Sequence, residues 1–294
     1  MAKKALRKTL PKEFDDALTK AATDGEYSAV HAMLQTCIVD ARSGYAHRTA
    51  LMRSECTPEL ARWLVANGAD VNAVDDYGDT ALHGSVFARY HHKLPPAVLV
   101  ELGADIHRAN KNGRTPLHAA VDGKNLASVE LLLAHGAQLD ALSNNDLTPL
   151  EYGLQRMSNI DLVAMEPVAR LLLAKGARVT RAPGFVDAAA KTFEFHRAGF
   201  AKDSVEATAA ACAALCAMFN VAAPAQRRMH DGVSPIVALA TTWQKRHAEL
   251  WDFLVPSSGA CATVQGEVIR IAGRVGDELH RNGGINWDSN HDAM

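Results

Sequence analysis

The chain has 294 residues, a net charge of −2, and 48% hydrophobic against 22% charged residues. This composition is too apolar for a disordered chain and is sufficient to bury a large core. The near-neutral charge lacks the basic excess that drives generic binding to nucleic acid or to anionic membranes, so we expect neither as a partner.

The basic start of the chain, up to Lys12, is followed by acidic residues instead of an apolar run, which argues against a signal peptide. No segment approaches the roughly 18 uninterrupted apolar residues of a membrane span. Five cysteines, an odd number, are sparsely placed in apolar surroundings, as is typical of a reducing compartment. We therefore expect a soluble, cytoplasmic protein.

Residues 1–40 show apolar residues at helical spacing on both sides of Gly25, including Leu18, Val30 and Leu34. The pattern predicts a helix-turn-helix. It lacks the motif that opens the later units, so we interpret this segment as a degenerate capping unit.

Residues 41–180 contain a repeated motif in which a threonine opens a short apolar helix. Its copies are Thr49-Ala50-Leu51, Thr80-Ala81-Leu82-His83, Thr115-Pro116-Leu117-His118 and Thr148-Pro149-Leu150. Threonine caps a helix and proline suits the first helical position, so the motif predicts helix starts. A Gly-Ala pair follows later in each unit and predicts the end of a second helix in a left-handed cap. The glycines of these pairs are Gly68, Gly103, Gly136 and Gly176.

The two anchors recur in fixed phase at intervals of about 33 residues. This pattern resembles the ankyrin repeat family, whose unit is a turn and two helices with a Thr-Pro-Leu-His core. The resemblance implies an all-α solenoid, and for His83 and His118 a structural hydrogen bond between adjacent turns. We expect about seven helix-turn-helix units, with degenerate repeats at both ends and a C-terminal capping helix.

Two stretches depart from the regular repeat. The unit opened by Thr148 carries extra residues, which fall in Met157 to Glu166 between its two helices. Residues 181–261 lack the signature, and we expect degenerate repeats there. The predicted helices cover Gly184 to Phe195 and Val205 to Val221, and another helix start is expected at Ser234-Pro235.

Residues 262–294 are interpreted as a capping helix and tail. An apolar stripe at three- and four-residue steps predicts that the helix seals the last repeat. The stripe consists of Val264, Val268, Ile271, Val275 and Leu279. The tail 281–288, which contains Trp287, is expected to fold back onto this helix or to form a second partner site.

The ankyrin resemblance implies that a partner protein binds along the concave face, which is lined by projecting turns and first helices. Tyr77, Phe87 and Arg114 rank highest, because aromatic residues and arginine carry most interface energy. Carried over by position, the candidate partner-binding residues are Tyr45, Arg48, Asp76, Tyr77, Asp79, Phe87, Lys111, Asn112, Arg114, Val121, Asp122, Asn144, Asn145 and Leu147.

Chemistry-bearing motifs are lacking. His91 and His92, and likewise Cys212 and Cys216, have no further residues at metal-ligand spacing. The sequence holds no phosphate loop, nucleophile elbow or His-Glu-x-x-His segment. We therefore expect no metal, no cofactor and no catalysis.

The favoured function is a monomeric scaffold that binds another protein, and the Ala-rich helices suit a bacterial source. Two roles stay open: an immunity or antitoxin-type inhibitor, and an adaptor or effector. The alternative from another class is an enzyme with an irregular site in residues 181–294 that uses the repeats as a docking arm.

Overall fold

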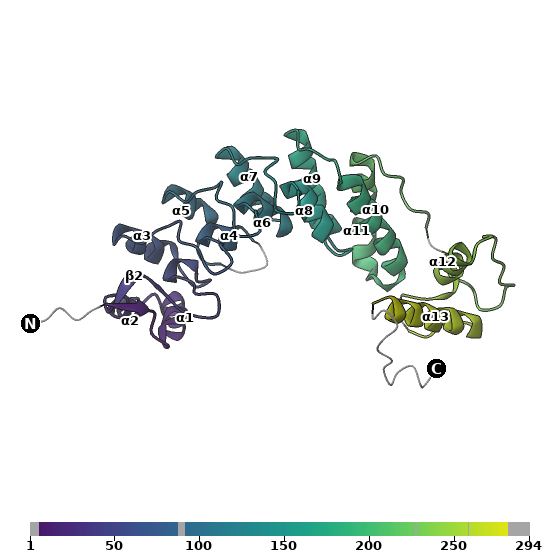
Figure 1. The fold of residues 1–294 in the computed structure, drawn as a ribbon, viewed down its shortest axis with the longest axis horizontal. Helices are drawn as coiled ribbons and strands as arrows, with labels where there is room; N and C mark the ends of the chain where they lie inside the picture. The colour runs from purple at the N-terminus through teal and green to yellow at the C-terminus, as the bar shows by residue number, and fades with distance from the viewer. Residues whose placement is uncertain (1–5, 88–91, 227, 258, 282–294) are drawn as a thin grey trace, which may run out of the picture.

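The structure, a computed structural model, describes residues 6–87, 92–226, 228–257 and 259–281. It is mostly helical, and the helices form an arch (Figure 1). The first elements are β1 (Arg7–Thr9), α1 (Phe14–Asp24), α2 (Ser28–Leu34), β2 (Cys37–Arg42), the 3-10 helix η1 (Ala50–Met52) and α3 (Pro58–Ala66). The central elements are α4 (Ala81–Val86), α5 (Pro96–Glu101), α6 (Pro116–Asp122), α7 (Leu126–Ala134), α8 (Pro149–Arg156) and α9 (Leu162–Ala174). The last are α10 (Ala182–His196), the 3-10 helix η2 (Arg197–Gly199), α11 (Lys202–Met218), α12 (Trp243–Leu254) and α13 (Val264–Arg281).

Three of the four predicted helix starts are confirmed. Thr80, Thr115 and Thr148 are extended N-cap residues, and each takes part in a reciprocal capping arrangement with the residue three positions later. This arrangement satisfies backbone N–H groups that the first helical turn cannot. The motif therefore determines where α4, α6 and α8 begin.

The predicted helix ends are also confirmed. Gly68, Gly103, Gly136 and Gly176 have φ angles of 92, 91, 88 and 89°. A Cβ at these positions would meet no atom within 4 Å, so the left-handed backbone, not packing, accounts for the glycines.

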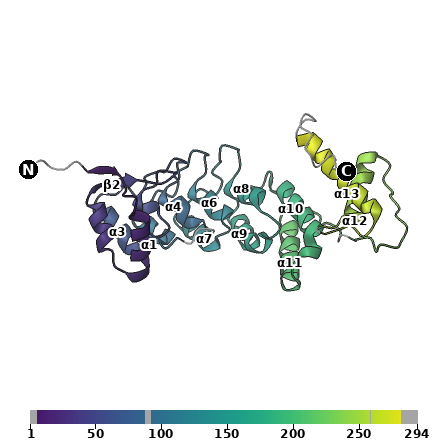
Figure 2. The same cartoon turned by 90° about the horizontal axis from the view of Figure 1, so that it is seen from below.

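The units stack helix on helix. Among the described elements, α4 packs on α6, α6 on α8 and α8 on α10, while α7 packs on α9 and α9 on α11. In Figure 1, α3, α5, α7 and α9 lie along the outer curve and α4, α6 and α8 lie inside it. Figure 2 shows the two rows side by side, with turns projecting beside α6 and α8. Leu82, Leu117 and Leu150, at one register of the motif, are fully buried between the helices.

The N-terminal segment corrects the all-α expectation. The strands β1 and β2 form a two-stranded parallel sheet, in which Arg7 pairs with Cys37 and Thr9 with Arg42. β2 includes the β-branched Ile38 and Val39, which favour an extended chain.

Thr49 does not open a full helix, contrary to prediction. Only the 3-10 helix η1 forms, and the Oγ1 atom of Thr49 is buried with no hydrogen-bond partner among the described residues. Arg53 leaves the helical conformation, and its Nε lies 3.3 Å from a carboxylate oxygen of Asp15. Met52 stands three residues after Thr49, where the later units have His83, His118 or Glu151, and its side chain cannot complete the reciprocal cap.

The extra residues of the Thr148 unit do not all lie between its helices. The loop covers only residues 157–161, and the remainder lengthens α9 at its start. Leu162 and Met165 are buried there, which stabilises the added helical turn. Asp161 accepts hydrogen bonds from Ser158 and lies 3.4 Å from the ammonium of Lys124, so the loop is tied to the end of α6.

The helix expected from Ser234 is not formed. The carboxylate of Asp231 accepts hydrogen bonds from the backbone N–H groups of Val233 and Ser234 at 2.9 and 2.8 Å, which holds a turn. The chain beyond it is irregular up to α12, and Val237 and Leu239 are 64% and 82% exposed. These exposed apolar side chains give the segment little burial, so helix formation gains too little. The count of about seven units stays a prediction.

The helices expected over 184–195, 205–221 and 264–279 are present as α10, α11 and α13. α13 packs on α12, where Gly273 lies against the ring of Trp251. Val264 and Val268 of the expected sealing stripe are 78% and 59% exposed, so the buried face differs from the predicted one. Sealing of the last repeat stays a prediction, and Trp287 lies outside the described residues.

Candidate partner-binding surface

A hollow of about 260 Å³ lies against the turns and first helices of consecutive units. It is lined by Arg48, Met52, Asp75, Asp79, Thr80, Ala81, His83, Gly84, Phe87, His92, Asn110, Arg114, Ala119, Asp122, Tyr152 and Arg156. Because every unit places its turn and first helix in the same way, residues one repeat apart in sequence meet here.

The register of the repeat explains why a hollow exists. Gly84, Ala119 and Tyr152 each stand four residues after the threonine that caps α4, α6 or α8, and all three line the hollow. The first two side chains are too small to fill the space between turn and helix. Tyr152 is large, and at 7% exposure its ring closes one end.

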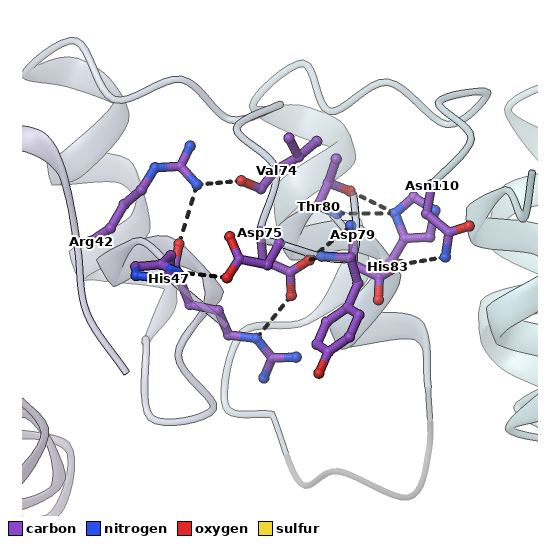
Figure 3. Close-up of polar contacts among 11 residues, drawn as sticks. Arg42, His47, Val74, Asp75, Asp79, Thr80, His83 and Asn110 are labelled. Carbon is purple, nitrogen blue, oxygen red and sulfur yellow. Dashed lines mark hydrogen bonds and ion pairs between the residues drawn. The ribbon is translucent and has the colours of Figure 1, made fainter. Parts of the chain in front are cut away.

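The turns are shaped by side chains that bond to their own backbone. The Asp75 carboxylate accepts hydrogen bonds from the N–H groups of Tyr77 and Asp79 at 2.9 and 3.0 Å and pairs with Arg48 at 3.1 Å (Figure 3). Asn110 repeats the pattern one unit later, where its amide oxygen accepts from the N–H groups of Asn112 and Arg114. Turn residues of this kind fix the loop conformation.

A backbone ladder joins the tips of successive turns. The N–H groups of Asp76, Lys111 and Asn144 each donate, at 3.0 Å, to a carbonyl of the preceding turn. Asn110 adds a side-chain link, because its amide nitrogen donates to Asp79 at 2.7 Å (Figure 3). The tips therefore form one continuous row whose backbone groups are largely satisfied.

The motif histidines make the expected structural hydrogen bonds. His83 accepts from the backbone N–H of Thr80 at 3.2 Å (Figure 3). Its Nε2 lies 3.0 Å from the carbonyl oxygen of Arg114. His118 repeats this with Thr115 and Leu147. An Nδ1 that accepts leaves the proton on Nε2, so both imidazoles are neutral. Burial lowers the pKa of His118 to about 4, and it also lowers the pKa of His83.

Two arginines share one aromatic ring at the end of the hollow. Arg114 donates from Nη1 to the Tyr152 hydroxyl at 2.6 Å, and the guanidinium carbons of Arg114 and Arg156 lie 5.5 and 5.6 Å from the ring centroid. Arg156 Nε lies 3.0 Å from both carboxylate oxygens of Asp122. Asp122 raises the pKa of Arg156, so this guanidinium stays charged.

The structure brings some predicted residues together and separates others. Five line the hollow: Arg48, Asp79, Phe87, Arg114 and Asp122. Seven are exposed on the turn tips outside it: Tyr45, Asp76, Tyr77, Lys111, Asn112, Asn144 and Asn145. The predicted set is therefore one row of tips with a recess beneath it.

Two predicted contact residues are wrong as surface positions. Val121 is fully buried, because α8 packs against it through Gly153. Leu147 is 1% exposed, and its carbonyl is the acceptor of His118. Asp122 is 8% exposed, lines the hollow and pairs there with Arg156. Inward-facing helix positions and the last turn residue are thus core.

Sequence reasoning missed Asp75, Tyr152 and Arg156. Asp75 could have been found, because it stands at the same place in its turn as Asn110. Tyr152 stands at the register of Gly84 and Ala119, so the first helix of the Thr148 unit should have been searched as the others were. Arg156 had no signal of its own, since its place depends on the tilt of α8 against α6.

Comparison with known proteins identifies the array. Residues 47–92 match a family model for ankyrin repeats in many copies, and residues 96–182 match one for three copies. These segments are ankyrin repeats. Repeats of this kind imply a scaffold for protein–protein interaction and typically carry no catalysis.

Several curated proteins are similar over parts of the ankyrin array. An ankyrin repeat protein of fowlpox virus is 29% identical over 106 residues, which is 36% of this chain and 31% of that protein. The Notch protein of Drosophila melanogaster is 36% identical over 98 residues, 33% of this chain and 4% of its own length. Alpha-latrotoxin-Lg1a of Latrodectus geometricus is 32% identical over 94 residues, 32% of this chain and 7% of its own length. The chain thus spans less than a third of each of these relatives.

A second hollow, of about 790 Å³, lies beyond the ankyrin array and bears on the alternative of an enzyme. Its charged lining residues include Lys191, Glu194 and Glu249. Lys191 pairs with Asp187 on its own helix, and Glu194 pairs with Arg197 three residues later. Glu249 accepts from two backbone N–H groups, which lower its pKa. These local contacts favour a structural role for the three side chains.

Within the described residues, no group of three or more histidine, cysteine, aspartate or glutamate side chains could hold a metal ion. No helix in the described part of the chain combines the length and apolar character that crossing a membrane requires.

Proposed function

We propose that this chain binds a partner protein along the inner curve of its ankyrin array. The contact surface, here called the inner-curve surface, comprises the exposed turn tips and the hollow beneath them. The observation that carries the proposal is the backbone ladder through Asp76, Lys111 and Asn144, which holds the tips of successive turns in one row. A preformed row limits the entropy that is lost on binding.

The side chains on this row suit a protein partner. Tyr45 and Tyr77 are 92% and 45% exposed although both are large and apolar over most of their surface. Tyrosine and arginine are enriched among the residues that dominate interface energy. A net charge of −2 does not favour nucleic acid as the ligand.

The hollow argues for a partner side chain and against a free metabolite. Its volume of about 260 Å³ is below the roughly 300–1,000 Å³ of typical small-molecule pockets. An interface pocket of this size accommodates one anchoring side chain. Binding of this kind would serve an inhibitor that covers an active cleft or an adaptor that tethers a second protein, and we retain both roles.

The test is affinity purification with mass spectrometry from the cells that express the protein. The double variant Tyr45→Ala/Tyr77→Ala removes two exposed side chains from the inner-curve surface. The matched control Glu130→Ala/His135→Ala removes two exposed side chains from α7 and its end on the outer curve. We expect the tip variant to lose a specific partner that the wild type and the control retain, with all melting temperatures similar.

A different result would reject this surface. If the tip variant keeps the partner and deletion of the segment after Gly259 removes it, the binding site lies in the C-terminal helices. If wild type and both variants recover no protein specifically, the proposed function is wrong.

A further inference from the structure

We infer that the hollow receives an acidic side chain, aspartate or glutamate, from the partner protein, and that Arg114 and Tyr152 hold it. The inference rests on the proposed function and names the chemistry of the partner at one point of the inner-curve surface. It starts from the way in which charge is distributed around the hollow.

Arg114 is the arginine of the hollow that lacks a carboxylate. Arg48 pairs with Asp75 at 3.1 Å, and Arg156 pairs with Asp122 at 3.0 Å. Among the described residues, no carboxylate forms an ion pair with Arg114, and its buried Nε has no hydrogen-bond acceptor. A guanidinium carries five donors, and Arg114, which lines the hollow, uses one of those on Nη1 for Tyr152, so its remaining Nη hydrogens can meet an incoming acceptor.

Tyr152 adds a second donor beside Arg114. Its hydroxyl oxygen already accepts the Nη1–H of Arg114 at 2.6 Å, so its own hydrogen can be donated to another acceptor. The ring lies between Arg114 and Arg156 and is 7% exposed, which holds both groups in place before a ligand arrives. A carboxylate has two oxygens and can take one hydrogen bond from each residue.

The surrounding acids select a carboxylate over a phosphate. Asp75, Asp79 and Asp122 also line the hollow. Asp75 and Asp122 are neutralised by their arginines, whereas Asp79 is held by the uncharged amide of Asn110 at 2.7 Å. The three arginines and three aspartates of the hollow balance in formal charge, so an incoming carboxylate adds one negative charge beside Arg114. A phosphate near −2 would add about twice that charge and more repulsion with Asp79.

Access to Arg114 depends on the small residues at the register of Tyr152. Gly84 and Ala119 line the same hollow, and Arg114 belongs to the turn between them. A Cβ at Gly84 would lie 3.3 Å from the imidazole of His92, which occupies the space beside this glycine, whereas Ala119 carries only a methyl group into the hollow. The sequence of the first helices thus leaves room next to the unpaired arginine.

The test uses a random library of short peptides displayed on phage, selected on the full chain. A selected peptide is synthesised with its acidic residue and with the corresponding amide, and binding is measured to the wild type, Arg114→Gln and Tyr152→Phe. The matched control is Arg108→Gln, which makes the same charge change at an exposed arginine outside the hollow. Circular dichroism checks that each variant is folded. If Arg114→Gln does not fold, Tyr152→Phe still tests the site, because it keeps the aromatic ring and removes only the hydroxyl.

We expect the selected peptides to share one acidic position. Its change to the amide should weaken binding to the wild type and to Arg108→Gln by about ten- to a hundredfold, the range for hydrogen bonds to charged groups. The same change in the peptide should have little effect on its affinity for Arg114→Gln, because the peptide carboxylate and the Arg114 guanidinium interact with each other. For Tyr152→Phe, the loss of affinity on changing the acid to the amide should lie between the losses measured for the wild type and for Arg114→Gln.

The outcomes separate the two proposals. Peptides that lose binding to Tyr45→Ala/Tyr77→Ala but share no acidic position, or show no coupling to Arg114, overturn the inference and leave the proposed function standing. A phosphoserine peptide that binds more tightly than the glutamate peptide, through Arg114, overturns the choice of carboxylate. If no peptide is selected, or if the selected peptides depend neither on the tip tyrosines nor on Arg114, both proposals fail.

Discussion

Glu151 Oε1 accepts a hydrogen bond from the backbone N–H of Arg181 at 2.6 Å, and this contact joins α8 to the start of α10. Glu151 stands at the motif position that histidine occupies in the two preceding units. There, the imidazoles of His83 and His118 donate to a carbonyl oxygen of the next turn. The link between units is thus kept while its direction is reversed.

Replacing Glu151 with the histidine of the two preceding units should therefore destabilise the protein. In Glu151→His, an Nδ1 that accepts from Thr148 would leave Nε2–H facing the N–H of Arg181, two donors with no acceptor. We expect a loss of about 1–3 kcal/mol in the free energy of unfolding, the cost of a buried unsatisfied polar group. Urea denaturation measures it, and Glu151→Gln, which keeps an acceptor for Arg181, should lose less. Equal or higher stability of Glu151→His would contradict the assigned role of the carboxylate.

Acidification should weaken the ankyrin array through its buried histidines. The pKa of His118 is about 4 in the folded chain against an ordinary value of 6.5, so the unfolded state binds the proton first as the pH falls. Stability from this residue is fully present above pH 6.5 and decreases toward pH 4, by about 3 kcal/mol in all. The measurement is the free energy of unfolding across this range.

The control for this pH effect is His118→Gln. The variant should be less stable than the wild type at neutral pH and should show a shallower decrease with acid. If the free energy of unfolding falls with pH as steeply in His118→Gln as in the wild type, other groups dominate this pH dependence. Asp161, whose pKa lies below 3.8, loses its contribution only at lower pH and does not account for this window.

Gly153 should not tolerate a methyl group, although it stands within a helix. A Cβ there would lie 2.5 Å from Cγ1 of Val121 and 3.2 Å from its carbonyl oxygen. Helix propensity favours alanine by about 0.5–1 kcal/mol, whereas overpacking costs about 1–3 kcal/mol, so Gly153→Ala should be destabilising overall. The matched control is Gly184→Ala in α10, where a Cβ meets no atom within 4 Å and stability should rise slightly. Chemical denaturation of both variants decides, and a stable Gly153→Ala would show that α6 and α8 can separate.

The tip tyrosines should titrate as neighbours. The hydroxyl of Tyr45 is the main cause that raises the pKa of Tyr77, because an ionised phenolate on one ring disfavours ionisation of the other. Tyr45→Phe should lower the pKa of Tyr77 toward 10, as followed by ultraviolet absorbance during alkaline titration. His47→Gln, at an exposed histidine that pairs with Asp76 on the same tip, serves as the control. An unchanged titration of Tyr77 in Tyr45→Phe would place the two rings apart.

The sequence was most informative where one local rule accounts for one structural feature. A capping threonine predicted the starts of α4, α6 and α8, and glycine in the left-handed region predicted four helix ends. These rules act within a few residues and can be recognised without a neighbour. They failed at Thr49 and Ser234, where the residue three positions later, Met52 or Val237, has no side-chain acceptor to complete the cap.

In the candidate site, too, the sequence predicted the features that local rules determine and missed those that depend on packing between units. The turn tips could be listed from sequence, because the repeat register carries them outward. Val121 and Leu147 were misplaced, because the same register does not say which side of a short helix faces the next unit. The pairing of Arg156 with Asp122 joins two helices whose distance depends on the side chains between them.

The amino-acid pattern alone determined that this protein is a stack of helical pairs, because helix caps and apolar spacing are local properties. Only the tertiary structure decided where the stack leaves a hollow and which arginine has no carboxylate partner among the described residues. Both follow from residues in four successive units, Arg48, Gly84, Ala119 and Tyr152 among them, meeting in space. Electrostatic pairing and free volume depend on distances between units, and no single repeat contains them.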